Sequence, residues 1–136
     1  MSDVVDVAVR VRYGETDQMG IAYHPSYFVW FEIGRTELLR QRGLAYRAME
    51  EEDGCFVVVT SASCDYRAPA RYDDELTVRT RVSSANSRRI AFAYEILAQD
   101  GRVLATGATS HVITDRGGRP RRLPERYLRA LAPSAR

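Results

Sequence analysis

Four long stretches with the pattern of β-strands follow one long helical segment in this chain of 136 residues. Residues 75–84 and 89–98 alternate between apolar and polar side chains, residues 54–67 are rich in Val and Phe, and residues 103–114 follow an Asp-Gly turn. Residues 4–13 alternate as well and precede the helix. Strands of this length exceed the usual ~5–6 residues. We therefore predict an α+β fold, with a curved antiparallel β-sheet wrapped around one long central α-helix.

The helix is predicted from an apolar stripe between residues 25 and 42, about 18 residues long. Pro25 suits its first turn, where a missing N–H costs nothing, and Gly43 follows its last turn. Gly34 lies within the stripe, where it costs ~1 kcal/mol of helix propensity relative to Ala. We expect a close approach of helix and sheet to compensate for it. Residues 44–53 indicate a second, short helical or irregular piece.

Length and composition predict a single domain over residues 1–136, because domains typically hold ~100–200 residues. Hydrophobic residues make up 45% of the chain and charged residues 28%, which excludes collagenous and wholly disordered proteins. No apolar run approaches the ~20 residues of a spanning helix, so no integral membrane segment is expected. The acidic N-terminus lacks the basic and apolar regions of a signal peptide, which favours a cytoplasmic protein.

The basic residues are all Arg, and they leave a net charge of only +2. This charge is too small to indicate nucleic acid as a partner. Near the C-terminus, four arginines surround two glycines and a proline: Arg116, Arg119, Arg121 and Arg122. Two interpretations stand side by side: a solvated loop leading into a short final helix, or a contact for a phosphate-rich ligand.

The two cysteines, Cys55 and Cys64, are nine residues apart in one predicted strand. At ~3.3 Å per residue they would lie about 30 Å apart, far beyond disulfide reach. Neither fits a metal-ligand pattern. We predict two reduced thiols and no metal site.

The segment between the first strand and the helix is the part of the sequence richest in chemistry. Asp17 stands in this irregular stretch, and Gly20 permits a positive φ or the close approach of another group. The helix start at residues 24–27 is expected to offer unpaired N–H groups to an oxyanion. A carboxylate placed just before such a helix can attack a carbonyl or act as a base while the helix polarises it. An acidic residue just before a helix is more often a simple helix cap, and this alternative stays open.

Residues 9–32 (VRVRYGETDQMGIAYHPSYFVWFE) resemble the opening of the 4-hydroxybenzoyl-CoA thioesterase-like acyl-CoA thioesterases of the hotdog superfamily. The likeness continues through residues 34–39 (GRTELL) and recurs at residues 66–76 (YRAPARYDDEL). With the remaining strand order, it covers nearly the whole chain. The Asp-x-x-Gly-x-x-Tyr-His stretch, residues 17–24, is its most specific part.

The resemblance implies a hotdog fold and hydrolysis of an acyl-CoA to a carboxylic acid and free CoA, with no cofactor beyond the substrate itself. Asp17 matches the catalytic carboxylate, the backbone N–H of His24 matches the donor to the thioester carbonyl, and Tyr23 lies beside it. Hydroxybenzoyl-specific members carry Trp-Tyr where this chain has Tyr-His, which places an aromatic substrate in doubt. The family also implies homodimers, often paired into tetramers, with active sites between subunits.

Further candidate residues carry more than one interpretation. Tyr27 can line an acyl pocket or belong to the core, and Glu32 can contact substrate, act as a second acid or form an ion pair. In related thioesterases, basic residues near Arg88 and Arg89 help to hold the phosphates of CoA; the alternative is a solvated hairpin tip. His111 occupies an alternating position in a predicted strand, where a structural role is favoured.

The predicted function is an acyl-CoA thioesterase. A thioester carbonyl is already electrophilic, so one carboxylate and one N–H donor are sufficient, with Asp17 as nucleophile or general base. Three alternatives remain: a hotdog hydratase or dehydratase acting on acyl thioesters, a non-catalytic acyl-CoA-binding or scaffold protein, and a nucleic-acid-binding β protein.

Overall fold

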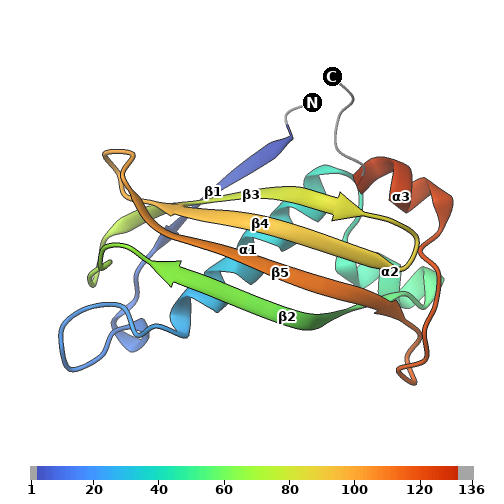
Figure 1. Ribbon diagram of the computed structural model, residues 1–136, viewed down its shortest axis with the longest axis horizontal. Helices are drawn as coiled ribbons and strands as arrows, with labels where there is room; N and C mark the ends of the chain where they lie inside the picture. Colours follow the sequence, from blue (N-terminus) through green and yellow to red (C-terminus); the bar gives the residue numbers. More distant parts are fainter. Residues whose placement is uncertain (1–2, 132–136) are drawn as a thin grey trace.

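The structure of the protein is a computed structural model that describes residues 3–131. The predicted domain ends, residues 1 and 136, lie outside the described part. The elements follow the predicted order (Figure 1): β1 (Val4–Arg10), the 3₁₀-helix η1 (Tyr13–Glu15), α1 (Ser26–Gln41), α2 (Tyr46–Asp53), β2 (Phe56–Tyr66), β3 (Glu75–Ala85), β4 (Arg89–Leu97), β5 (Val103–Thr114) and α3 (Glu125–Leu131).

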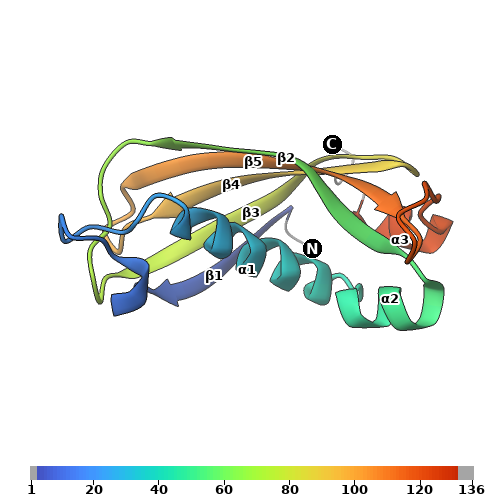
Figure 2. The same ribbon diagram turned by 90° about the horizontal axis from the view of Figure 1, so that it is seen from below.

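The five strands form one antiparallel sheet in the order β1-β3-β4-β5-β2. Figure 2 shows α1 lying along the concave face, with the strands curving over it. The long strand β2 is one edge of the sheet, and the shorter β1 is the other. The predicted α+β hotdog architecture is confirmed.

Gly34 brings α1 against the middle of the sheet, as the sequence predicts. A Cβ atom at this position would lie 2.8 Å from Val78 Cγ1 and would collide with the Thr80 hydroxyl. On β5, a Cβ at Gly107 would collide with the ring of Phe31. Helix and sheet therefore approach closely at two places where only glycine fits.

The core lies between α1 and the concave face of the sheet. The predicted apolar stripe of the helix is buried throughout: Tyr27, Trp30, Phe31, Gly34, Leu38 and Leu39. Leu76, Val78, Ile90, Phe92 and Ile96 oppose it from β3 and β4. Burying a large apolar side chain contributes about 1.5–3 kcal/mol, so this interface is the main source of stability.

The first strand ends earlier than the alternation predicts. β1 stops at Arg10, and Val11 donates its N–H to the Asp74 carbonyl as the chain turns into η1. Tyr13, expected on the buried face, is 79% exposed and packs edge-on against Tyr72. The reason is geometric, because side chains alternate between two faces only while the backbone stays extended.

The helix and cysteine predictions are corrected in detail. α1 spans 16 residues, and α2 is a regular helix that ends at Gly54 in the left-handed conformation. Cys55 therefore precedes β2, and the two cysteines do not share a strand. Both are free thiols, as predicted.

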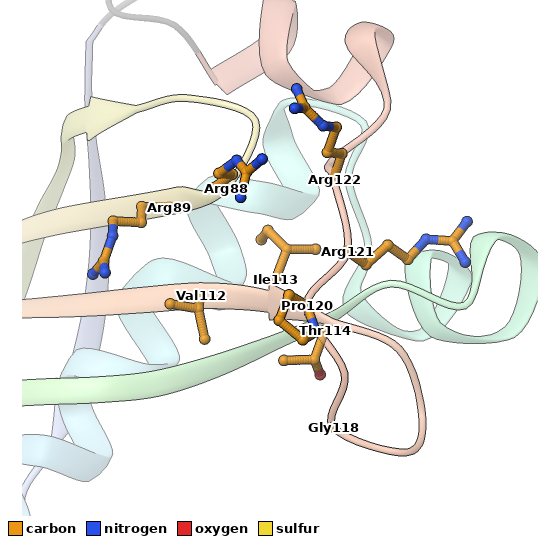
Figure 3. A pocket seen from close by; sticks show the side chains of 9 residues that line it. All are labelled: Arg88, Arg89, Val112, Ile113, Thr114, Gly118, Pro120, Arg121 and Arg122. Carbon is orange, nitrogen blue, oxygen red and sulfur yellow. The ribbon is translucent and has the colours of Figure 1, made fainter.

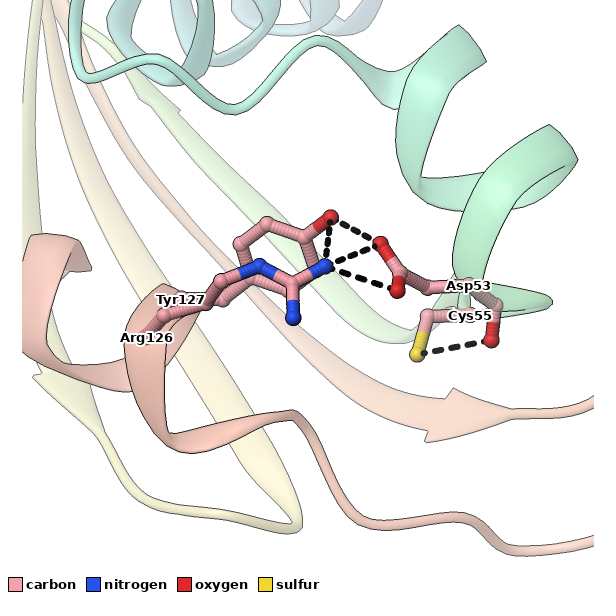
Figure 4. Close-up of polar contacts among 4 residues, drawn as sticks. All are labelled: Asp53, Cys55, Arg126 and Tyr127. Atoms are coloured by element: carbon pink, nitrogen blue, oxygen red, sulfur yellow. Dashed lines mark hydrogen bonds and ion pairs between the residues drawn. The ribbon is translucent and has the colours of Figure 1, made fainter.

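α3 is fastened to the end of α2 by one polar cluster (Figure 4). Asp53 accepts hydrogen bonds from the Arg126 guanidinium, at 2.7 and 2.8 Å, and from the Tyr127 hydroxyl. The Arg126 guanidinium also lies over the Tyr127 ring. Hydrogen bonds from Tyr127 and Arg126 hold the pKa of Asp53 below its ordinary value. The C-terminal helix thus closes the end of the core beyond α1.

Candidate active site

Asp17 stands on a tight loop that its own backbone closes. Its N–H donates to the Ile21 carbonyl at 2.9 Å, and its carbonyl accepts from Gly20 N–H at 3.0 Å. Gly20 adopts a φ of 79°, as its place in the sequence predicts. One carboxylate oxygen, Oδ1, accepts the Met19 N–H at 2.9 Å. The carboxylate is therefore fixed within its own loop and does not cap α1.

The Asp17 cleft is a cavity of about 350 Å³ beside the start of α1. The loop supplies one wall and the end of β2 with the following residues supplies the other. The lining residues are Asp17, Met19, Ile21, Ala22, His24, Tyr27, Tyr66, Arg67, Ala68 and Pro69. The structure thus brings together three of the predicted site residues, Asp17, His24 and Tyr27.

The start of α1 offers fewer free N–H groups than the sequence suggests. Ser26, Tyr27 and Phe28 donate their N–H groups to the carbonyls of the residues three positions earlier. The expectation of a row of unpaired donors is therefore wrong, because the preceding turn already satisfies them. Pro25 has no N–H, and within residues 3–131 the His24 N–H has no hydrogen-bond acceptor. One backbone donor, at His24, remains beside the cleft.

Tyr66 holds His24 in place from the far wall. Its hydroxyl donates to the His24 carbonyl at 2.8 Å, and its ring lies edge-on to Tyr27 at 4.9 Å between centroids. Burial raises the pKa of both tyrosines, and the nearby Cys64 thiol adds to the effect at Tyr66. Both hydroxyls therefore stay protonated near neutral pH and can donate hydrogen bonds.

The sequence-based prediction did not include Tyr66 or Arg67 in the site. Both stand at the end of β2, more than forty positions from the loop they face. The only signal available was their place in the second motif of the family resemblance, residues 66–76.

Five predicted site residues lie outside the wall of the cleft, and three of them line neither this cleft nor the arginine pocket described below. Gly20 shapes the loop, and Tyr23 is 51% exposed with its ring edge-on to His24. Glu32 is exposed on α1, one turn beyond the residues that line the cleft. Glu32 does not line the cleft of its own chain.

Arg88 and Arg89 line a separate arginine pocket of about 420 Å³ (Figure 3). The Asn86 side chain accepts both of their backbone N–H groups at 2.9 Å and shapes the β3–β4 turn. Arg121 and Arg122 of the C-terminal segment border the same pocket. The four side chains extend in different directions, so the pocket has a broad cationic rim.

The other two arginines of the C-terminal cluster have local roles. The Arg116 guanidinium lies over the Phe56 ring, 5.0 Å from its centroid. The Arg119 N–H donates to the Asp115 side chain at 3.0 Å and closes a turn. The cluster is therefore divided between a solvated turn and the rim of the arginine pocket.

The two pockets lie at opposite ends of the sheet. The Asp17 cleft adjoins Tyr66 at the end of β2, and the arginine pocket includes Thr114, which pairs with Phe56 at the start of β2. At ~3.3 Å per residue, β2 alone separates them by about 33 Å. One chain therefore cannot bring both pockets to the same end of a small substrate.

Residues 3–131 hold no group of three or more His, Cys, Asp or Glu side chains arranged to bind a metal ion. No helix among them is long and apolar enough to span a membrane.

A curved sheet around one helix, with a carboxylate and a free N–H beside the helix start, defines a hotdog protein with a site suited to carbonyl chemistry. The chain matches the thioesterase-like superfamily over residues 11–131, and it belongs to that family. The family predicted from the sequence is confirmed.

Individual relatives agree with this assignment. The chain is 35% identical over 108 residues to the putative acyl-CoA thioesterase YneP of Bacillus subtilis, covering 79% of this chain and 78% of the relative. It is 35% identical over 118 residues to the acyl-CoA thioester hydrolase YbgC of Escherichia coli O157:H7, covering 86% and 87%. The crystal structure of a DHNA-CoA thioesterase from Staphylococcus aureus superposes with a TM-score of 0.84 at 30% identity, covering 88% and 80%.

Proposed function

We propose that this protein is an acyl-CoA thioesterase that uses Asp17 as its catalytic carboxylate and the His24 N–H as the donor to the thioester carbonyl. The observation that carries the proposal is the Asp17 cleft, which is lined both by a fixed carboxylate and by His24, whose backbone N–H has no acceptor within residues 3–131. Relatives named as acyl-CoA thioesterases over most of this chain support the same reaction.

The reaction needs one nucleophile and one anion-stabilising donor. The carbonyl oxygen gains negative charge as water or the carboxylate adds to the carbon, and the His24 N–H stabilises that charge. Collapse of the adduct breaks the C–S bond and releases the CoA thiolate, which takes up a proton. With Asp17 as base, the carboxylate accepts the proton of the attacking water; with Asp17 as nucleophile, water then hydrolyses the acyl-aspartyl anhydride.

We infer that the working enzyme is a homodimer, or a tetramer built from two dimers, joined through β2. This strand is an 11-residue sheet edge with exposed Val58 and Val59, and long exposed edges invite association. An antiparallel pairing centred on Ser61 would set Tyr66 beside Phe56 of the second copy. The Asp17 cleft of one copy would then adjoin the arginine pocket of the other.

This assembly gives the nucleotide end of acyl-CoA a cationic partner. Arg88 and Arg89 would hold phosphates, because guanidinium groups bind phosphate through a planar fork. The free thiols of Cys55 and Cys64 fit a reducing compartment, which supports the cytoplasm as the location.

Thiol release from a panel of acyl-CoAs, followed with a colorimetric thiol reagent, tests the proposed activity. We expect release from at least one straight-chain or aromatic acyl-CoA and slower release from the matching acyl-pantetheine, which lacks the nucleotide. Absence of release across the panel, from protein shown to be folded, would contradict the proposal and favour a binding or scaffold role.

A further inference from the structure

Glu15 is an acidic side chain that the fold buries directly before the Asp17 loop. It is 7% exposed, and no other acidic residue within residues 3–131 is buried. A buried carboxylate is costly unless it is hydrogen-bonded or paired. Its contacts therefore show what the fold gains from placing it there.

The Glu15 carboxylate joins η1 to α1. Oε1 accepts the Arg12 backbone N–H at 2.8 Å, and Oε2 accepts the indole N–H of Trp30 at 3.0 Å. The exposed Arg12 guanidinium adds an ion pair at 3.3 Å. Burial opposes ionisation, but these contacts outweigh it and hold the pKa of Glu15 below its ordinary value.

The backbone of Glu15 closes the far end of the same loop. Its carbonyl accepts the Tyr23 N–H at 2.7 Å and the Ser26 hydroxyl at 3.0 Å. The residues between these contacts, 16–22, carry Asp17, and Tyr23 precedes His24. Side chain and backbone of one residue thus hold both ends of the loop against the first turns of α1.

Trp30 extends this contact to the wall of the cleft. Its ring is 1% exposed and lies edge-on to Tyr27, with 4.7 Å between centroids. Tyr27 lines the Asp17 cleft. The Glu15–Trp30 hydrogen bond therefore fixes the loop and one wall of the cleft with respect to the same helix.

We propose that Glu15 is a positioning residue for the reaction: through Trp30 and Ser26 it sets the distance between the Asp17 carboxylate and the His24 N–H. The inference rests on the proposed thioesterase function. Small displacements of a reacting group reduce the rate of the chemical step while leaving binding largely intact. Glu15 touches neither substrate nor reacting atoms, so its effect should fall on kcat.

Glu15→Gln is the variant that tests the proposal. Glutamine has nearly the same size, but its NH₂ group cannot accept a hydrogen bond from Arg12 or Trp30. We expect kcat for thiol release to fall roughly tenfold with KM changed less than about twofold. Trp30 is the only tryptophan of the chain, so its fluorescence should also change.

Two variants serve as controls. Glu37→Gln makes the same chemical change later in α1, where the partly exposed Glu37 pairs with Arg40, and should change neither kcat nor fluorescence. Asp17→Asn should abolish most activity while Trp30 fluorescence stays as in the wild type.

A double variant tests the contact itself. Trp30→Phe removes the indole donor, so Glu15→Gln should lower kcat less in the Trp30→Phe background than it does in the wild type.

The outcomes separate the two proposals. An unchanged kcat in Glu15→Gln, or fully additive effects with Trp30→Phe, would overturn the positioning role. If Glu15→Gln fails to fold, the kcat of Trp30→Phe decides, and a wild-type value there would overturn the role. Absence of thiol release from the wild type would refute the proposed function itself, and a fluorescence change in Glu15→Gln would still establish the Glu15–Trp30 contact.

Discussion

The two ends of the sheet differ in how firmly they hold their polar groups. At the Asp17 cleft, the carboxylate is tied to Met19, and His24 is held by Tyr66. At the arginine pocket, Arg88, Arg89, Arg121 and Arg122 are exposed and extend in different directions. A reacting carbonyl needs fixed groups, because catalysis depends on geometry, whereas a phosphate can be held by mobile charges.

This difference fits a substrate with a small reactive end and a long anionic tail. The ends lie about 33 Å apart along one strand by the ~3.3 Å rise per residue, so they serve one substrate only if a second copy is present.

The largest effect is expected at the fixed end. Asp17→Asn is nearly isosteric and keeps an acceptor for the Met19 N–H, but it cannot act as nucleophile or base. We expect kcat to fall by at least ~10²-fold, with normal folding and preserved acyl-CoA binding. Steady-state thiol release measures kcat, and a melting curve reports folding. Full activity at an unchanged melting temperature would assign Asp17 a purely structural role.

The arginine-pocket end should affect binding instead of chemistry. Changing Arg88 and Arg89 together to Ala should raise KM for acyl-CoA by about tenfold or more, since each charge-assisted contact contributes about 1.5–3 kcal/mol. Activity on the matching acyl-pantetheine should stay nearly constant, because that substrate has no nucleotide phosphates. Equal losses on both substrates would indicate a structural role for the pair.

The β2 edge runs between the two pockets, and an added charge on it should weaken the proposed dimer. Val59 is 47% exposed on β2, and Val59→Asp places a carboxylate where the second copy is proposed to pack. We expect the dissociation constant of the dimer to rise at least tenfold, equivalent to about 1.4 kcal/mol. Light scattering against dilution measures it, with Gln99→Asp in the exposed β4–β5 turn as control. A wild-type protein that is already monomeric at micromolar concentration would contradict the assembly.

A further effect concerns β5, where His111 is fully buried close to the arginine-pocket end of the sheet. Its Nε2 shares a hydrogen bond with Thr109 at 2.8 Å, and burial lowers its pKa to about 4. The unfolded chain binds this proton near pH 6.5 and the folded chain only near pH 4. Stability should therefore decrease as pH falls through this interval, by up to about 1.4 kcal/mol per pH unit.

Denaturant unfolding between pH 7 and pH 4 measures this dependence. His111→Gln should lower stability at neutral pH and flatten the slope over the same interval. A slope as steep in the variant as in the wild type would assign it to other groups.

The sequence predicted local features better than contacts between distant segments. The strands, α1 and the close approach at Gly34 follow from periodicity and from one glycine in an apolar stripe. The loop around Asp17 could also be anticipated, because Gly20 and the break in alternation lie within a few residues of it. Each of these features depends on neighbours in the chain.

Contacts between segments far apart in the chain could not be predicted from local sequence patterns. Tyr66 reaches the cleft because the register of β2 with β5 brings its hydroxyl to the His24 carbonyl. The free N–H groups expected at the start of α1 are mostly used by a tight turn that no periodicity signals. The Glu15 carboxylate, which sequence patterns would place on the surface, is buried because Trp30 and Arg12 donate to it.

The paired glycines of the core also limit how this protein can change its substrate. Neither Gly34 nor Gly107 can accept a methyl group without displacing a neighbour, so the close spacing between α1 and the sheet depends on both glycines. A new acyl preference would therefore have to arise from replacements in the cleft wall, such as Met19 or Ile21. Such replacements would reshape the pocket without altering the packing of α1 on the sheet.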